Sequence, residues 1–222
     1  MSSFTTSSIS IDSGRLMLIG VCAMNAGDVG MPLDNITLSD SGSHTWTTVA
    51  GVEWTGFWGF AQKWFRAVKS GSGSISFTAS MTGGQDGGFG VHVLSYSGYD
   101  PGNPIGLTAS SAFNSPLDGS YSLALGGTTA ASSSVLGSMF CDAQPNARRA
   151  PGTGWTELVD GDGNYDVSVQ LQDRVAAVSS VDWADLYDTG STGTLYVVTA
   201  LAIEIKAAAE GQIYRPKIIM WS

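Results

Sequence analysis

Six aromatic rings lie in twelve residues of this chain: Trp54-Thr55-Gly56-Phe57-Trp58-Gly59-Phe60-Ala61-Gln62-Lys63-Trp64-Phe65. Alternation along one extended strand would divide these rings between two faces. One face would carry Trp54, Trp58, Phe60 and Trp64. The rings are therefore either the buried core of a β-sandwich or an exposed platform on which sugar rings stack, and the sequence leaves both interpretations open. In the second interpretation, the stacking residues are Trp54, Trp58 and Trp155.

Short apolar or alternating runs, separated by Gly, Ser, Asn, Asp and Pro, continue on both sides of this stretch. Residues 74–80 alternate apolar and hydroxyl side chains, as a strand with one wet face requires. Residues 16–24 and 194–206 are apolar on both faces, which predicts central strands that are covered on both sides. With 29 glycines and only 13% charged residues, the chain is predicted to be all-β, an antiparallel, jelly-roll-like β-sandwich.

The length of 222 residues suits one all-β domain. We predict a single sandwich over residues 1–206, followed by a linker and apolar tail over 207–222, and we find no repeat of fixed period. Pro216 restricts the tail to a sheet edge. The tail either closes the sandwich or docks on a neighbouring subunit, and in the second case we expect it to add a strand to that subunit's open edge. The expected contact residues are Ile213, Tyr214, Ile218, Ile219 and Trp221.

Charge and apolar length exclude several kinds of partner. The net charge of −9 and the pI of about 4.4 repel nucleic acid and anionic lipid. No apolar run approaches the eighteen or so residues of a membrane span, and the run after Arg15 lacks a lipoprotein cleavage pattern, so we expect synthesis without export. The two cysteines, Cys22 and Cys141, each end an apolar run and are expected to stay unpaired.

Reactive motifs are sparse. His44 lies in a Ser/Gly turn and His92 in an apolar strand, with no metal-ligand spacing beside either, and no Gly-x-Ser-x-Gly motif occurs. The carboxylates outside turn-like contexts are Glu53 and Glu204, and a spatial carboxylate pair of the glycosidase type remains open. We predict no enzymatic activity and no cofactor.

The strongest metal candidate is an acidic loop over residues 160–166. Its oxygen-bearing side chains at alternate positions would suit calcium. They are Asp160, Asp162, Asn164 and Asp166. The same residues form ordinary β-turns, and Tyr165 occupies the place of the glycine in an EF-hand loop. We therefore prefer a simple turn and keep calcium as the alternative.

Several segments together resemble a jelly-roll domain of tailed-bacteriophage virion surface proteins. The resemblance covers roughly residues 14–206 and rests on order and character. The segments are Leu16 to Ala23, Trp46-Thr47, Ser70 to Thr78, Val93 to Asp100 with Pro104-Ile105, Gly154 to Leu158, and Val167 to Val175.

The resemblance implies a non-enzymatic structural subunit of a virion surface, either a head-decoration, fibre or tail-surface protein. It further implies assembly in the host cytoplasm, other virion proteins as partners and a homo-oligomer such as a trimer. The alternative from another class is a carbohydrate-binding or receptor-binding adhesin module that uses the tryptophans named above on a host surface glycan. Exposure of the tryptophans separates the two interpretations.

Overall fold

The protein is built almost entirely from antiparallel β-strands, which confirms the all-β, sandwich-like prediction. The computed structural model describes residues 2–25, 31–56, 59–82, 86–114, 119–142, 148–162, 167–187, 197–209 and 214–221. Within these ranges the single helical element is the 3-10 turn η1, Leu33–Asn35. All strand pairings are antiparallel, and the finer jelly-roll topology stays a prediction.

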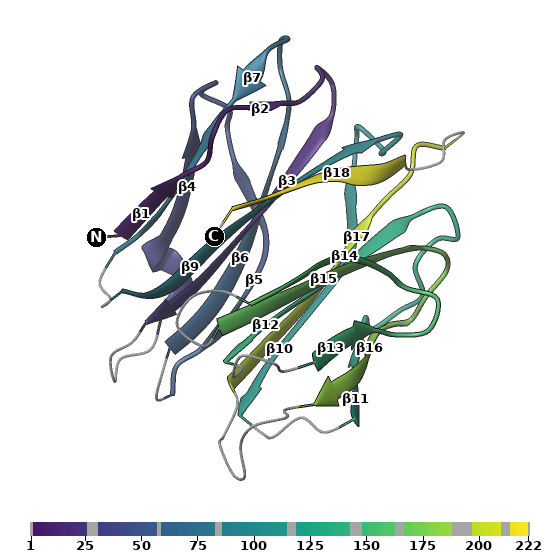
Figure 1. Ribbon diagram of the computed structural model, residues 1–222. Coiled ribbons are helices and arrows are strands. Elements are labelled where there is room, and N and C mark those ends of the chain that lie inside the picture. Colours follow the sequence, from purple (N-terminus) through teal and green to yellow (C-terminus); the bar gives the residue numbers. More distant parts are fainter. Residues whose placement is uncertain are drawn as a thin grey trace. The chain divides into compact units, whose positions relative to one another are not determined.

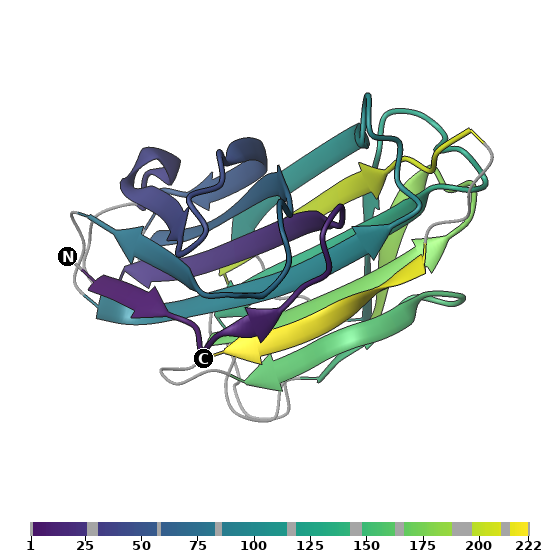
Figure 2. The ribbon, with the colours of Figure 1, turned by 90° about the horizontal axis from the view of Figure 1, so that it is seen from above.

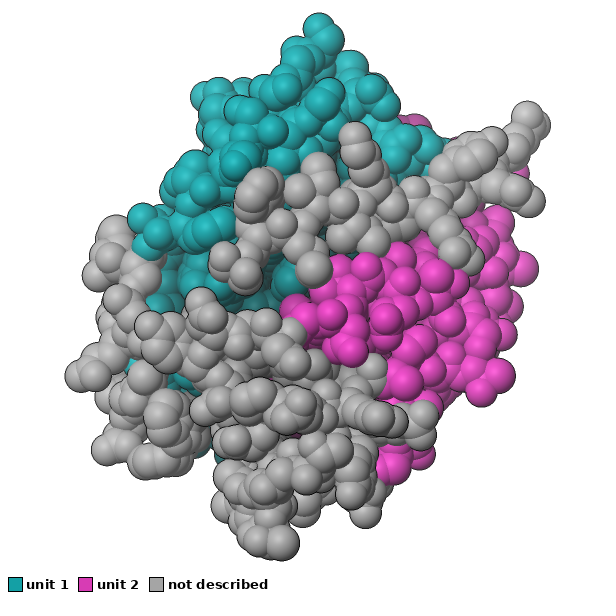
Figure 3. All heavy atoms as spheres, viewed as in Figure 1, with its two compact units in different colours: residues 1–99, 214–222 teal, residues 100–213 magenta. Residues whose placement is uncertain are grey.

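The chain divides into two compact units (Figure 3). Unit 1 comprises residues 1–99 and 214–222, and unit 2 comprises residues 100–213. The sequence predicted one domain over 1–206 and a tail over 207–222. Residues 214–221 form instead a strand of unit 1, so the described part of the predicted tail belongs to a sheet.

Unit 1 has a five-stranded sheet in the order β18-β9-β3-β6-β5, a three-stranded sheet in the order β1-β8-β4, and the short pair β2-β7 (Figures 1 and 2). Both larger sheets contribute side chains to one core. The strands are β1 Ser2–Thr5, β2 Ile9–Ser10, β3 Leu16–Asn25, β4 Ile36–Asp40, β5 Thr47–Trp54, β6 Gly59–Val68, β7 Ser74–Ile75, β8 Phe77–Met81, β9 Asp86–Ser97 and β18 Tyr214–Trp221.

The central strand β3 is buried on both faces, as its sequence predicted. Met17 and Ile19 face the core shared with the three-stranded sheet, and Leu18, on the other face, is equally buried. A Cβ on Gly20 would lie 2.5 Å from the ring of Trp64 on β6. Glycine at this position therefore makes room for the largest buried side chain of the unit.

The aromatic stretch forms a hairpin rather than one strand. β5 ends at Trp54 and β6 begins at Gly59, and Trp54 pairs with Phe60 across the two strands. Phe60 and Trp64 on β6 are fully buried, and Phe65 is 6% exposed on the opposite face. For these three rings the core interpretation is confirmed.

Unit 2 has a five-stranded sheet in the order β10-β17-β12-β15-β14 and a three-stranded sheet in the order β11-β16-β13. Its core includes Trp155, Trp183 and Cys141. The strand β17 is buried along its whole length, as predicted. The strands are β10 Ile105–Asn114, β11 Gly119–Ala124, β12 Ser134–Asp142, β13 Arg148–Pro151, β14 Thr156–Asp162, β15 Val167–Val175, β16 Ser180–Tyr187 and β17 Val197–Ile205.

Apart from the short pair β2-β7, the two units repeat one topology in their described strands. In the five-stranded sheets, β3, β5, β6 and β9 of unit 1 correspond to β12, β14, β15 and β17 of unit 2. In the three-stranded sheets, β1, β4 and β8 correspond to β11, β13 and β16, with the same neighbours and the same order along the chain. The chain is thus an internal repeat at the level of topology, which the search for a sequence repeat missed.

Local details recur at matching places. In unit 1 a bulge in β5 lies between Thr48 and Ala50, and in unit 2 a bulge in β14 lies between Glu157 and Val159. A Trp-Thr pair leads into each of these strands, at residues 46–47 and 155–156. A β-bulge fixes the twist and register of a strand pair, so its recurrence supports the correspondence between the units.

The fifth strand of each five-stranded sheet pairs with a strand other than the one that precedes it in the chain. β10 follows β9 in sequence but pairs with β17, while β18 follows β17 but pairs with β9. Both ladders have a bulge after their first paired residue, between Ile105 and Thr108 in β10 and between Tyr214 and Lys217 in β18. We call β10 and β18 the exchanged strands. Without exchange, each would form a hairpin with the strand that precedes it.

Candidate functional site

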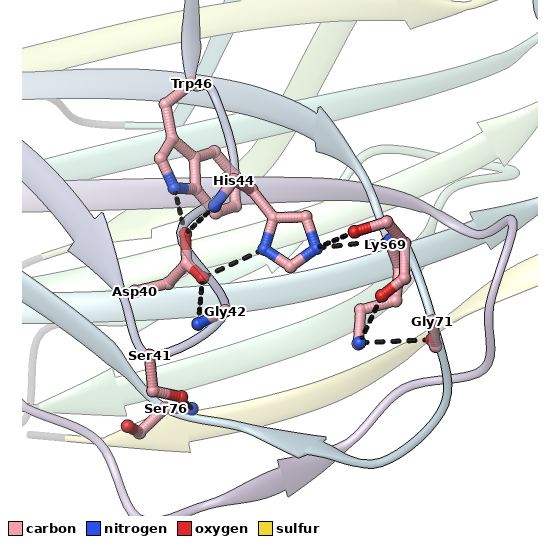
Figure 4. A network of polar contacts seen from close by, with 9 residues as sticks. Asp40, Ser41, Gly42, His44, Trp46, Lys69, Gly71 and Ser76 are labelled. Atoms are coloured by element: carbon pink, nitrogen blue, oxygen red, sulfur yellow. Dashed lines mark hydrogen bonds and ion pairs between the residues drawn. The ribbon is translucent and has the colours of Figure 1, made fainter.

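The densest group of polar side chains in the described residues surrounds Asp40, at the end of β4 (Figure 4). Its carboxylate accepts hydrogen bonds from the backbone N–H of Gly42 at 2.6 Å, from Nδ1 of His44 at 2.9 Å and from the indole N–H of Trp46 at 2.7 Å. The Asp40 side chain is 0% exposed. Burial by itself raises the pKa of Asp40, but these hydrogen bonds and the charge on His44 outweigh it and leave the pKa below its usual value.

His44 joins this turn to the connection between β6 and β7. Its Nε2 lies 3.1 Å from the backbone nitrogen of Ser70 and 3.2 Å from the hydroxyl of Ser70. Asp40, His44 and Ser70 therefore form the chain of contacts that a Ser-His-Asp triad uses. The sequence analysis missed this group, although the four-residue spacing between Asp40 and His44 was a readable signal.

The geometry makes this group a clamp on the backbone. An imidazole nitrogen has one in-plane lone pair, and at Nε2 of His44 the backbone N–H of Ser70 already uses it. Within the same connection, Lys69 Nζ donates to the carbonyl oxygens of Ser70 at 2.8 Å and Gly71 at 3.2 Å (Figure 4). The group thus fixes two loops of unit 1 against each other.

Two carboxylates that the sequence analysis singled out also serve the backbone. Glu53 accepts from the N–H of Leu33 at 2.7 Å in unit 1. In unit 2, Glu204 accepts from the N–H of Leu107 at 2.9 Å and of Ala130 at 3.1 Å. Burial tends to raise the pKa of Glu204, but these hydrogen bonds and the charge of Lys206 lower it overall. Both carboxylates act as fixed acceptors that hold loop segments in place.

His92 lies in an apolar setting on β9. Its side chain is buried, and among the described residues neither ring nitrogen has a hydrogen-bond partner. Burial lowers the pKa of His92 to about 4, so the ring is neutral at pH 7. Its Cα partners are Gly20 on β3 and Met220 on β18, which places it in the middle of the sheet.

The tryptophans proposed for glycan stacking do not form an exposed platform in the described residues. Trp155 is 7% exposed and belongs to the core of unit 2, so the prediction that it stacks on a ligand is wrong. Trp54 is half-buried, and a Cβ on Gly56 would lie 2.6 Å from its indole nitrogen, so the next turn of chain lies against the ring. Trp58 lies outside the described residues.

Only part of the calcium candidate can be placed. Asp160 and Asp162 are on the strand β14, where they pair with Gln170 and Ser168 of β15. Asn164 and Asp166 lie outside the described residues. Across the described ranges, no three His, Cys, Asp or Glu side chains gather as a metal site would require. The strand position of Asp160 differs from the loop that the calcium alternative needs.

The residues expected to contact a partner lie on a paired strand. Tyr214, Ile218, Ile219 and Trp221 are on β18 and have the Cα partners Ser97, Leu94, Val93 and Val91 on β9. Ile213 lies outside the described residues. Strand addition at an open edge was the predicted mode of contact. The structure places this mode within the chain itself, at the edge of unit 1.

Neither Cys22 nor Cys141 forms a disulfide, as expected; both are buried, and each lies in a different unit. Burial raises the pKa of Cys22 well above its usual value. No helix in the described part of the chain is long and apolar enough to cross a membrane. Neither a known protein family, nor a curated protein, nor a solved structure matches this chain.

Proposed function

We propose that this protein is a non-enzymatic structural subunit that acts through contacts with further copies of itself and with other proteins of an assembly. The observation that carries the proposal is the pairing of β18 with β9, which completes the sheet of unit 1 with a strand that follows unit 2. Pairing of an added strand with an open edge is also how many proteins join their subunits. The chain thus contains the elements that such contacts require.

The polar groups of the described residues support a structural role. The carboxylates of Asp40, Glu53 and Glu204 each accept hydrogen bonds from backbone N–H groups of nearby loops. General acid–base chemistry needs a group whose proton can move to a substrate. These carboxylates hold loops through their hydrogen bonds. The pKa values of Asp40 and Glu204 are lowered, which favours the permanently charged form of both groups.

The setting we propose is the surface of a tailed-phage virion, with the protein as a head-decoration, fibre or tail-surface subunit assembled in the host cytoplasm. This part rests on the resemblance of the segments between residues 14 and 206 to virion surface domains. The partners are other virion proteins and further copies, in a closed oligomer such as a trimer. A net charge of −9 suits protein partners better than nucleic acid.

The test is the mass of the purified protein in solution, measured by light scattering for the full chain and for a version that ends at Ala209. We expect a stable oligomer for the full chain and its loss on truncation, because the shorter version lacks β18. Circular dichroism of both versions serves as the control for retained β-structure. A full chain that stays monomeric from micromolar to millimolar concentration would refute the proposal.

A further inference from the structure

The two exchanged strands differ in how their units are built. Unit 2 is one continuous segment, residues 100–213, and β10 lies inside it. Unit 1 is discontinuous, and β18 reaches it only through the connection over residues 206–213. Release of β18 from β9 therefore leaves unit 2 and all its pairings complete, whereas release of β10 would open unit 2 itself.

Release of β18 would leave β9 as an open edge of the five-stranded sheet. β9 is the only neighbour of β18 in the sheet, and six of its residues pair with β18, from Val91 to Ser97. Without β18, β9 would present unpaired N–H and C=O groups along this length. Such an edge is a template for another strand. The bulge between Tyr214 and Lys217 sets the register in which β18 pairs with β9, and the sequence of β18 fits this register.

From this we propose that β18 is a transferable strand, and that in the assembly it pairs with β9 of a second copy of this chain. The inference rests on the proposed structural function and specifies its contact. The second copy is the occupant because the transferred strand would make the same ladder, in the same register, as it makes within one chain. No backbone hydrogen bond is lost in the exchange, so concentration and tether length decide between the two arrangements.

Charge and reach agree with this arrangement. β18 contains Arg215 and Lys217 in a chain of net charge −9, so it is attracted toward another copy rather than repelled. The connection over residues 206–213 extends to roughly 25 Å at about 3.3 Å per residue. The edge strand β9 of the accepting copy must lie within this reach of the end of β17 of the donor, and transfer from each copy to the next gives a closed oligomer.

A disulfide between the two strands distinguishes the arrangements. Val93 and Ile219 are Cα partners in the middle of the β9·β18 ladder, and paired residues are close enough for a disulfide. The full-length variant Val93→Cys/Ile219→Cys is unfolded in urea with reductant, refolded at about 1 μM and at about 1 mM, oxidised, and separated on a non-reducing gel. The lower concentration is far below the millimolar effective concentration typical of a short tether, and the upper one reaches it.

The control is a matched pair in the other ladder. Ala112 and Thr199 are Cα partners on β10 and β17, and the variant Ala112→Cys/Thr199→Cys is treated in the same way. Both variants retain Cys22 and Cys141, which are buried. We expect the β9·β18 disulfide to join two chains at 1 mM and one chain at 1 μM, and the β10·β17 disulfide to stay within one chain at both concentrations.

Intrachain disulfides alone for the β9·β18 variant at 1 mM would overturn the inference. If that variant does not refold, two differently tagged wild-type chains, refolded together and separately before mixing, replace it, and co-purification only after joint refolding is the expected result. Light scattering on the same samples separates the two proposals. Oligomers without interchain β9·β18 disulfides would refute strand transfer and leave the structural function standing, whereas monomers throughout would refute both.

Discussion

Acidification is expected to destabilise unit 1 through one residue, His92. The pKa of His92 is lowered from 6.5 to about 4 because the ring is fully buried. The unfolded chain therefore takes up a proton at a higher pH than the folded protein does. The contribution of the neutral His92 ring to the free energy of unfolding is complete above pH 6.5. It falls as the pH drops from 6.5 to 4 and does not change further below pH 4.

The size of the effect follows from the shift. Each pKa unit corresponds to 1.36 kcal/mol, so a shift from 6.5 to about 4 gives a loss of about 3 kcal/mol between pH 7.5 and pH 4. This is a large part of the 5–15 kcal/mol that typically stabilises a folded protein. Among the described residues, the thiol of Cys22 is the titratable neighbour of His92 on the same face of the sheet. Its raised pKa keeps this thiol neutral throughout the range from pH 7.5 to pH 4.

The assay is urea unfolding of the wild type and of His92→Leu at a series of pH values. All other titrating groups are present in both proteins, so the difference between their unfolding free energies isolates His92. We expect this difference to change by about 3 kcal/mol between pH 7.5 and pH 4, in the direction that favours His92→Leu in acid. A difference independent of pH, or an NMR titration of His92 with a pKa near 6.5, would show that the reasoning is wrong.

Three further changes test the packing and the polar clamp. Gly20→Ala places a Cβ 2.5 Å from the Trp64 ring and is expected to lower the free energy of unfolding by about 1–3 kcal/mol. The control Gly161→Ala, whose Cβ has nothing within 4 Å, should change it by less than about 0.5 kcal/mol. Equal effects of the two variants in urea unfolding would contradict the packing of Gly20 against Trp64. Asp40→Asn is expected to lose about 1–3 kcal/mol at pH 7. Because the pKa of Asp40 is lowered in the folded state, its carboxylate contributes stability above its ordinary pKa of 3.8, and this contribution is lost as the pH falls below that value. The difference in unfolding free energy between the wild type and Asp40→Asn should therefore shrink in acid. A difference that stays constant in urea unfolding from pH 7 to pH 2.5 would argue against this. Trp155→Ala is expected to lower the free energy of unfolding by about 3–5 kcal/mol, measured in thermal or urea unfolding, because the ring is buried. A near-neutral result would favour the interpretation of Trp155 as an exposed, ligand-binding ring.

Alternation and composition were sufficient to predict the strand class of this protein. The hydroxyl–apolar pattern of residues 74–80 became β7 and β8, and the two runs without a polar face became β3 and β17, each buried along its length. The aromatic stretch was read as one strand because six rings outweighed the glycines between them. Those glycines flank the turn of a hairpin, and side-chain period alone does not distinguish a long strand from two paired ones.

The exchange of strands could not be read from the sequence. β10 is the segment Ile-Gly-Leu-Thr-Ala-Ser-Ser-Ala-Phe-Asn, whose small and hydroxyl residues gave no strand signal. Local pattern also cannot assign a strand to its partner, because β9 and β18 pair although the whole of unit 2 lies between them in the sequence. The polar clamp was missed for a related reason, since Ser70 meets His44 only after β6 and β7 are in place.

The discontinuity of unit 1 sets the order in which the protein is completed during synthesis. Every strand of unit 2 leaves the ribosome before β18 does, although unit 1 was begun first. At about 5–20 residues per second, β9 waits on the order of ten seconds for its final neighbour. In that interval β10, the next strand to emerge after β9, also waits for its own partner, β17. The second half of the chain is therefore the first to mature, and the beginning of the polypeptide is finished last.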